Sequence, residues 1–420
     1  ERYWGTPLPV WRCEKCGVCE AIESREELAK RGHGTNEFFF IRHGQSENNV
    51  SGLPGSNRDT PEYTFRLTAM GKKQAEDAGK KLSKLDIDLI ISSPLLRTKE
   101  TAQIIAKSVG APVEYHEKLV DVDPGSFLGK RESEWKPSYW TASDQFSKPL
   151  PDGESRDGAK LRALRVIREI NAKHKGKKIL IVSHGDILWL LRGALHDLSN
   201  EEIAKQPYPQ NAELYGPSWK ALPLDEDGKI DLHRPYVDSF EISCSKCGGV
   251  SRRVKEVVDV WFDSGSMPLA QWHYPFEGKE IVDKGKMFPA DYISEAMDQT
   301  RGWFYTLLAV STLLGRKAPY KNVISLGLIH DKFGQKMSKS RGNIVDPWEM
   351  INKHGVDAVR WYFYTVSPPG EQKNFDEEEI KKSFRKFHSI LYNSLVFYLT
   401  YADRGARSVS KKPDSVLDQW

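Results

Sequence analysis

The sequence contains no long apolar run. No stretch of about 18 consecutive apolar residues, the length that spans a bilayer, occurs in its 420 residues. Neither a membrane-spanning helix nor a membrane partner is therefore expected. Residues 1–4 include no Met and no basic-then-apolar targeting pattern. Because the first residues have the character of a chain interior and the tail stops soon after a helix-like segment at 384–401, we expect a piece of a longer protein.

Cysteine is scarce, and its placement argues against a disulfide framework. Among the five cysteines are two pairs with CxxC spacing, Cys13 with Cys16 and Cys244 with Cys247. An odd number of cysteines in this arrangement is typical of metal ligation in a reducing compartment, so we expect a cytoplasmic protein. Cys19 forms a further CxxC with Cys16 and is a rival to Cys13. The alternative is two unrelated pairs of thiols.

The composition is that of an ordinary globular protein. Hydrophobic residues make up 39% and charged residues 29% of the chain, and its length is sufficient for two or three domains. The net charge of +4 permits contact with nucleic acid but does not argue for it, because many enzymes of similar charge never bind RNA.

The stretch 36–213 alternates short apolar strands with amphipathic helices. Strands are predicted at 38–41, 89–91 and 179–182, and helices at 71–85 and 97–109. This alternation predicts an α/β fold with a parallel sheet that is covered by helices on both faces. Functional sites in such sheets lie at the carboxyl ends of the strands.

The sequence changes character after residue 213. A turn-rich junction at 217–228 contains Pro, Asp and Gly. Beyond it we expect one buried strand at 322–328, then a loop rich in Gly and Lys, and then a helix at 347–354. Residues 371–420 are predicted to be helical.

Three predicted strand ends carry groups that suit a phosphate. Arg42 and His43 follow the first strand. Arg97 lies just beyond the second strand, and His184 follows the third. In a parallel sheet these ends converge, so that two guanidiniums and helix N-termini can hold a phosphate while a neutral imidazole attacks phosphorus. A single histidine here would more simply be a lone polar residue, but three strand ends together favour a site.

The same stretch resembles the histidine phosphatase (phosphoglycerate mutase-like) superfamily. The motifs are, in order, Arg42-His43-Gly44, Asn49, Leu67-Thr68-x-x-Gly71-x-x-Gln74-Ala75, Ser93-Pro94-x-x-Arg97-x-x-x-Thr101-Ala102 and Ser183-His184-Gly185. The resemblance implies that His43 is the nucleophile and becomes phosphohistidine. It also implies that Arg42, Arg97 and His184 hold the phosphate, together with Asn49 and Gly44.

The general acid of this superfamily lies in a Leu-x-Glu-x-x-x-Gly stretch. Residues 119–125 match the pattern, with Asp121 in place of the glutamate. The resemblance therefore implies that Asp121, whose side chain is one methylene shorter, is the acid. Asp123 is the alternative.

A lysine- and serine-rich loop follows the predicted strand 322–328. It reads Lys336-Met337-Ser338-Lys339-Ser340. Positive charge on a mobile loop can stabilise the pyrophosphate that leaves ATP. Alone, the string is equally compatible with a solvated loop.

Longer motifs on both sides of the 34–213 stretch resemble class I aminoacyl-tRNA synthetases of the isoleucyl type. They cover Tyr3 to Cys13, Asp231 to Asp238, Asp259 to Ser266 and Asp298 to Phe304. The resemblance implies ATP-dependent charging of tRNA with isoleucine. The residues that it implies for the aminoacyl-adenylate are Glu295, Asp298, Gln299 and Trp303, and those for ATP are Lys336, Ser338 and Lys339.

The chain departs from this family in three respects. Ala296 stands where the family has glycine, and Ser325-Leu326-Gly327 stands where it has Val-Asn-Gly. A Cβ at position 296 can crowd a ligand that approaches the backbone, so substrate affinity is the property affected. The His-x-Gly-His element that binds ATP does not occur in these 420 residues, and we expect no ATP–pyrophosphate exchange from them.

The paired cysteines resemble a four-thiolate structural zinc site made of two CxxC knuckles. Its ligands would be Cys13, Cys16, Cys244 and Cys247. In the family the two knuckles are close in sequence, whereas here the phosphatase-like stretch separates them. We therefore expect the start and end of the insert to be adjacent in space.

These observations predict a layout of five segments. Residues 1–33 and 214–258 form a zinc-knuckle connective segment, 34–213 the inserted αβα phosphatase-like domain, 259–370 a Rossmann-type synthetase half and 371–420 the start of a helical anticodon-binding-type domain. The expected partners are tRNA and a phosphorylated small molecule, with the lid at 126–147 deciding the latter.

Three functions fit this layout. The first is a ligase fragment with an active phosphatase insert. The second is a stand-alone phosphohydrolase with relic flanks, and the third is a tRNA- or metal-binding module in which both sites are inactive.

Overall fold

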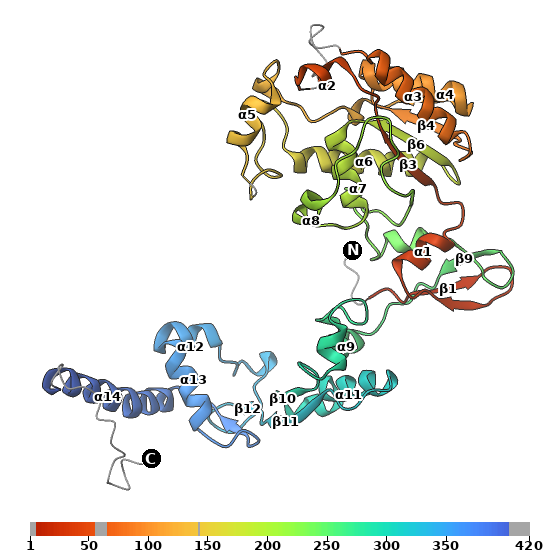
Figure 1. Cartoon of the computed structure of the whole chain (residues 1–420). Coiled ribbons are helices and arrows are strands. Elements are labelled where there is room, and N and C mark those ends of the chain that lie inside the picture. The colour runs from red at the N-terminus through yellow and green to blue at the C-terminus, as the bar shows by residue number, and fades with distance from the viewer. Residues whose placement is uncertain (1–5, 55–64, 142, 403–420) are drawn as a thin grey trace. The chain divides into compact units, whose positions relative to one another are not determined.

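The computed structural model describes residues 6–54, 65–141 and 143–402. The chain divides into two compact units, Glu1–Val258 and Asp259–Trp420 (Figure 1). The first residues of the Tyr3 to Cys13 motif and the tail 403–420 lie outside the described residues. Within the described part, no helix combines the length and apolar character needed to cross a membrane.

A five-stranded sheet organises the first unit. Its order is β5 (Val113–Tyr115), β4 (Leu89–Ser92), β6 (Lys178–Ser183), β3 (Glu37–Arg42) and β7 (Trp219–Lys220). The first four strands are parallel, and β7 runs antiparallel to β3. The three predicted strands are confirmed as β3, β4 and β6.

Side chains alternate between the two faces of this sheet, as the period of a strand requires. Phe38 and Phe40 of β3 belong to one buried core, whereas Ile41 belongs to the other. Helices α6 (Arg156–Lys173) and α7 (Gly185–Leu195) cover the first face, and α3 (Ala69–Leu82) and α4 (Leu96–Val109) cover the second (Figure 1). Each fully buried large apolar side chain contributes roughly 1.5–3 kcal/mol. Both predicted helices are confirmed as α3 and α4.

Shorter elements surround these layers. They are α1 (Arg25–Arg31), α2 (Glu47–Ser51), α5 (Glu132–Tyr139), α8 (Asn200–Lys205) and the 3-10 turns η2 (Glu117–Leu119), η3 (Gly125–Phe127) and η4 (Tyr236–Ser239).

The start and end of the insert are hydrogen-bonded neighbours. Glu37 at the start of β3 pairs with Lys220 of β7, and the Ala221 N–H donates to the Asn36 carbonyl at 2.9 Å. The predicted end of the insert at residue 213 is therefore too early, because β7 completes the sheet and Trp219 is buried in its core. A two-residue strand leaves no periodic pattern from which its place could be predicted.

A smaller antiparallel sheet joins segments from both sides of the insert. Its order is β2 (Cys19–Ala21), β1 (Val10–Cys13), β9 (Val250–Arg253) and β8 (Ile242–Ser243). The side chain of Arg253, at the end of β9, is buried, bonds to Asp238 and donates to the carbonyls of Leu8 and Glu256 at 3.1 and 2.9 Å. These bonds hold the two chain segments together.

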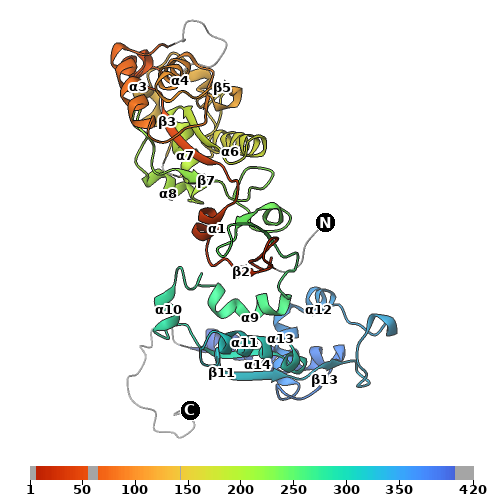
Figure 2. The ribbon, with the colours of Figure 1, turned by 90° about the vertical axis from the view of Figure 1, so that its right-hand side faces the viewer.

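The second unit contains two small parallel sheets and several helices. β10 (Ala290–Ala296) pairs with β11 (Tyr320–Leu326), and β12 (Ile329–His330) pairs with β13 (Lys373–Asn374). The helices are α9 (Val260–Ala270), α10 (Lys279–Asp283), α11 (Trp303–Leu313), α12 (Pro347–His354), α13 (Val356–Thr365) and α14 (Glu377–Tyr401). Figure 2 shows α9 beside α11. The helix predicted at 347–354 is confirmed as α12.

The prediction of a buried strand at 322–328 is only half correct. The strand exists as β11, but Val323 and Ile324 are 42% and 40% exposed. Within the described residues β10 is its single neighbouring strand, and the core of Ile293, Phe304 and Leu307 joins β10 to α11. An apolar strand pattern predicts a strand but does not tell how many layers cover it.

Candidate functional site

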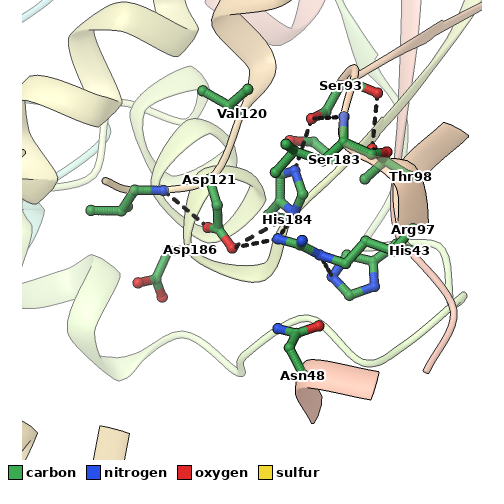
Figure 3. A network of polar contacts seen from close by, with 12 residues as sticks. His43, Asn48, Ser93, Arg97, Thr98, Val120, Asp121, Ser183, His184 and Asp186 are labelled. Atoms are coloured by element: carbon green, nitrogen blue, oxygen red, sulfur yellow. Dashed lines mark hydrogen bonds and ion pairs between the residues drawn. The ribbon is translucent and has the colours of Figure 1, made fainter. Parts of the chain in front are cut away.

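The site of the first unit forms where three parallel strands end. Arg42 lies opposite Ser183 in the register of β3 and β6, and Ser92 lies opposite Val182 in that of β4 and β6. The residues that follow these strands therefore emerge at one edge of the sheet. Figure 3 shows His43, Arg97 and His184 together at this edge.

Two glycines allow the loop after β3 to pack against α3. A Cβ on Gly44 would lie 2.4 Å from the Gly71 carbonyl oxygen, and one on Gly71 would lie 1.9 Å from that of Gln45. The Gly44 N–H also donates to Thr101 Oγ1 at 3.1 Å, and this hydroxyl donates to the Arg97 carbonyl at 2.7 Å. The backbone contact and the hydroxyl bridge together place His43 beside α4.

The hydrogen bonds of His43 define its tautomer. Its Nδ1 lies 2.7 Å from the Gly44 carbonyl oxygen, which can only accept, so Nδ1 carries the proton. Arg97 Nε, which can only donate, lies 3.2 Å from Nε2. Nε2 therefore keeps its lone pair, which is the form of imidazole that can attack phosphorus.

The guanidinium of Arg97 connects the two histidines and Asp121. Its Nη2 donates to His184 Nδ1 at 2.9 Å and to Asp121 Oδ2 at 3.3 Å (Figure 3). His184 Nε2 is then left to donate to Ser93 Oγ at 2.9 Å. Arg97 is 1% exposed, so these are contacts of a buried cation.

Burial and the arginines set the protonation of the site. Burial lowers the pKa of His43 and of His184 well below the ordinary value, and the neighbouring Arg97 lowers both further. Both imidazoles are thus neutral at physiological pH. Burial raises the pKa of Asp121 to about 6, in part against the opposite effect of Arg97. A carboxyl with such a pKa can donate a proton near neutral pH.

The remaining predicted residues occupy different places around the site. Arg42 lines the cavity, donates from Nη1 to the Pro209 carbonyl at 3.0 Å, and has a buried Nε without a partner. Asn49 also lines the cavity, and its Oδ1 accepts from Asn211 Nδ2 at 3.2 Å. The Asp123 carboxylate instead accepts from the Gly125 N–H at 3.0 Å. Asp121 is therefore the better placed of the two candidate acids.

A cavity of about 410 Å³ opens above these groups. Sequence reasoning named none of the residues on its outer wall beyond placing the lid at 126–147. They are Trp135, Lys136, Trp140, Arg156, Asp186 and Tyr208. Asp186 lies next to Asp121 in Figure 3, and although burial raises its pKa, Arg156 and Lys136 lower it overall. No local pattern marks these residues, because they meet only through the fold.

The four predicted metal ligands come together in the smaller sheet. The sulfurs of Cys13, Cys16, Cys244 and Cys247 all lie within 4.8 Å of one another. Both knuckles have the same backbone bonds, since the Gly17 N–H donates to the Cys13 carbonyl and the Gly248 N–H to that of Cys244. Cys19 is not part of the group, and its sulfur accepts from Arg12 Nε at 3.3 Å. The cluster could bind a metal ion.

The predicted synthetase residues form two sets in the second unit. Gln299 lies in the 3-10 turn η5 (Met297–Arg301), donates to Asp298 Oδ2 at 3.1 Å and accepts from the Trp303 N–H at 2.9 Å. Glu295 lies exposed near the end of β10. Lys336, Ser338 and Lys339 follow β12, where the Ser338 N–H donates to Asn343 Oδ1 at 2.9 Å. Among the described residues, no hydrogen bond or ion pair joins the two sets.

The geometry defines an αβα domain whose parallel strands end at a cluster of two histidines, an arginine and an aspartate. Residues 38–221 match the family model of the histidine phosphatase superfamily (branch 1). Residues 216–376 match that of the class I tRNA synthetases (I, L, M and V). Both resemblances predicted from the sequence are confirmed.

The curated relatives agree with the match to the class I tRNA synthetases. The chain is 49% identical over 205 residues to an isoleucine–tRNA ligase of Clostridium tetani, which covers 48% of this chain and 19% of the relative. It is 50% identical over 200 residues to that of Dehalococcoides mccartyi, covering 46% and 19%. The chain thus spans about a fifth of the length of these relatives.

Solved structures similar to this chain include several phosphatases. One is a mycobacterial glucosyl-3-phosphoglycerate phosphatase, 23% identical, with a TM-score of 0.37 over 42% of this chain and 87% of the other. Another is Bacillus stearothermophilus YhfR, 24% identical, with a TM-score of 0.37 over 53% and 98%. The assignment of the insert rests on its sheet order and on the family model.

Replacing Asp121 by Asn should change the pH dependence of stability. The pKa of Asp121 rises from 3.8 to about 6 on folding, so its contribution to stability is fully present below pH 3.8 and is lost as the pH rises through about 6. Relative to the parent chain, Asp121→Asn should gain about 1–3 kcal/mol between pH 4.5 and pH 7.5. Urea unfolding at both pH values measures this difference, and equal differences at the two pH values would contradict it.

Proposed function

We propose that the inserted domain hydrolyses phosphomonoesters through a phosphohistidine at His43. One observation carries the proposal: the buried guanidinium of Arg97 contacts both imidazoles and the carboxylate of Asp121. A phosphate held by this guanidinium would lie beside both a nucleophile and an acid. The same grouping argues against an inactive binding module.

In the first step, His43 Nε2 attacks phosphorus while the ester P–O bond breaks. Arg97 Nε would move from Nε2 to a phosphate oxygen and so release the lone pair. Together with Arg42, it would stabilise the charge on the phosphoryl oxygens as the group transfers. Asp121 gives its proton to the leaving alkoxide, so that alcohol and phosphohistidine are formed.

In the second step, the Asp121 carboxylate takes a proton from water and the resulting hydroxide attacks phosphorus. The P–N bond breaks, its electron pair returns to His43 Nε2, and inorganic phosphate leaves. The neutral state of both imidazoles in the buried site suits this step, because a neutral His43 is restored at its end.

His43→Ala should abolish both turnover and the acid-labile phosphoenzyme, because it removes the attacking nitrogen. Asp121→Asn should slow hydrolysis of an alkyl phosphate by about 100-fold or more but leave phosphate binding nearly unchanged, since it removes the proton donor alone. Steady-state hydrolysis and acid-quench labelling measure these effects. His116→Ala, at a partly exposed histidine bonded to Glu169, is the matched control. Hydrolysis at the parent rate by His43→Ala would refute the mechanism.

For the cysteine cluster we propose one structural zinc ion. Four thiolates at about 2.3 Å from a tetrahedral zinc lie about 3.8 Å apart. The observed separations are 3.5 Å for Cys13–Cys247, 3.7 Å for Cys16–Cys244 and 3.6 Å for Cys16–Cys247. A bound zinc would tie together the two segments that flank the insert.

The purified chain should contain one zinc per molecule. Cys13→Ser should lose the metal and lower the melting temperature, because structural zinc contributes roughly 10 kcal/mol or more of binding free energy. Cys19→Ser, outside the cluster, should keep both the metal and the melting temperature. Elemental analysis and thermal unfolding decide the matter, and a metal-free parent protein would contradict the proposal.

A separate function is proposed for the second unit. It is supported by the identity near 50% to isoleucine–tRNA ligases. We propose that the unit is part of a ligase that uses ATP to charge tRNA with isoleucine. Glu295 and Asp298 would neutralise the ammonium and accept ribose hydroxyls of the adenylate. Trp303 would line the side-chain pocket, and Lys336 and Lys339 would bind ATP phosphates. The alternative, relic synthetase flanks, gains no support from the comparisons.

These 420 residues should bind a non-hydrolysable isoleucyl-adenylate analogue. Glu295→Gln should raise its Kd about tenfold, because a charge-assisted hydrogen bond is lost. Glu280→Gln removes an exposed carboxylate that bonds to Lys284 and should leave the Kd unchanged. Calorimetric titration measures both, and equal affinities of the parent and Glu295→Gln would exclude the assigned role.

A further inference from the structure

The outer wall of the phosphatase cavity contains a second buried arginine that the proposed reaction does not use. Arg156 begins α6, lines the same cavity as His43 and is 9% exposed. Its guanidinium carbon lies 4.4 Å from the ring centre of Trp140 and 5.5 Å from that of Trp189. The two indoles hold the cation in one position.

Among the described residues, the cation has one nearby carboxylate, that of Asp186, and makes no direct hydrogen bond to it. Arg156 Nη1 donates to Gln145 Oε1 at 3.2 Å, but the Asp186 carboxylate is 3.7 Å from Nη2, beyond hydrogen-bond distance. Asp186 also accepts from the Tyr208 hydroxyl at 3.0 Å. Arg156 Nε is buried without a partner. The guanidinium therefore keeps donor capacity, at Nε above all, that the oxygens of an incoming anion can use.

A second unpartnered donor lines the same cavity. Trp135 is 6% exposed and its indole Nε1 has no acceptor. The ring is stacked on Phe127 with centres 4.4 Å apart, which fixes its orientation. A buried donor without an acceptor costs about 1–3 kcal/mol, so a ligand that supplies oxygens here is favoured.

We propose that Arg156 and Trp135 bind a carboxylate of the substrate, so that the phosphomonoesters hydrolysed here carry a carboxylate on their alcohol part. The inference rests on the proposed phosphatase function and narrows its substrate class. A cavity of about 410 Å³ suits a small metabolite. Of the other acids on the wall, Glu132 is paired with Lys136 at 2.5 Å, and Asp186 accepts from Tyr208 and lies 3.7 Å from Arg156 itself. Neither is left as an isolated negative charge that would repel the ligand.

The test compares phosphoglycolate with 2-hydroxyethyl phosphate, which has a hydroxymethyl group in place of the carboxylate, in hydrolysis by the full chain. The parent protein should prefer phosphoglycolate in kcat/KM by about tenfold or more. Arg156→Met should remove this preference, and Trp135→Phe, which removes the N–H but keeps the stacked ring, should reduce it. Both variants should hydrolyse an aryl phosphate within about threefold of the parent rate. Arg165→Met, on the same helix but paired with the exposed Asp227, should behave as the parent.

The outcomes separate this inference from the function on which it rests. Hydrolysis of the aryl phosphate without preference for phosphoglycolate would overturn the carboxylate subsite and leave the phosphatase standing. A chain inert toward every phosphomonoester would refute the phosphatase, and calorimetry with phosphoglycolate would then decide the subsite. A Kd raised about tenfold by Arg156→Met supports it, and an unchanged Kd overturns it.

Discussion

The site of the first unit depends on one buried cation. Arg97 is inside the protein, yet its guanidinium reaches His43, His184 and Asp121 from a single position at the start of α4. Such a position requires a planar group with donors in fixed directions, which lysine does not offer. Burial lowers the pKa of both imidazoles and the cation lowers it further, while the same cation partly offsets the rise that burial causes in the pKa of Asp121. The proposed nucleophile, phosphate ligand and acid therefore belong to one hydrogen-bonded network.

The backbone around this network is built to bring α3 and α4 close to the loop after β3. Gly44 and Gly71 approach so closely that neither position has room for a Cβ. Thr101 then links the Gly44 N–H to the Arg97 carbonyl. Residues with no role in the proposed reaction thus determine the distance between His43 and Arg97.

The sequence contained enough information to predict the inner site but not the outer wall. Alternation of apolar residues places strands, and their ends place Arg42, His43, Arg97 and His184 in one region. The choice between Asp121 and Asp123 could not be made, because residues two apart in an extended segment point to the same side. Only the fold shows that Asp123 caps the Gly125 N–H and leaves Asp121 at the site. Arg156 and Trp135 meet through tertiary packing, which no local pattern encodes.

The position of the two cysteine knuckles explains how the small sheet can form although a whole domain is inserted between its strands. Cys16 and Cys244 are 228 positions apart in sequence, yet their sulfurs are 3.7 Å apart. To the small sheet, the whole phosphatase domain is a loop between two strands. The entropy lost on closing a flexible loop grows only with the logarithm of its length, about 0.6 kcal/mol for each doubling. A pair of strands such as β1 and β9 can therefore accept a folded domain between them as readily as a long disordered loop, provided that the domain begins and ends at one place. The pairing of β3 with β7 brings the two ends of this domain together.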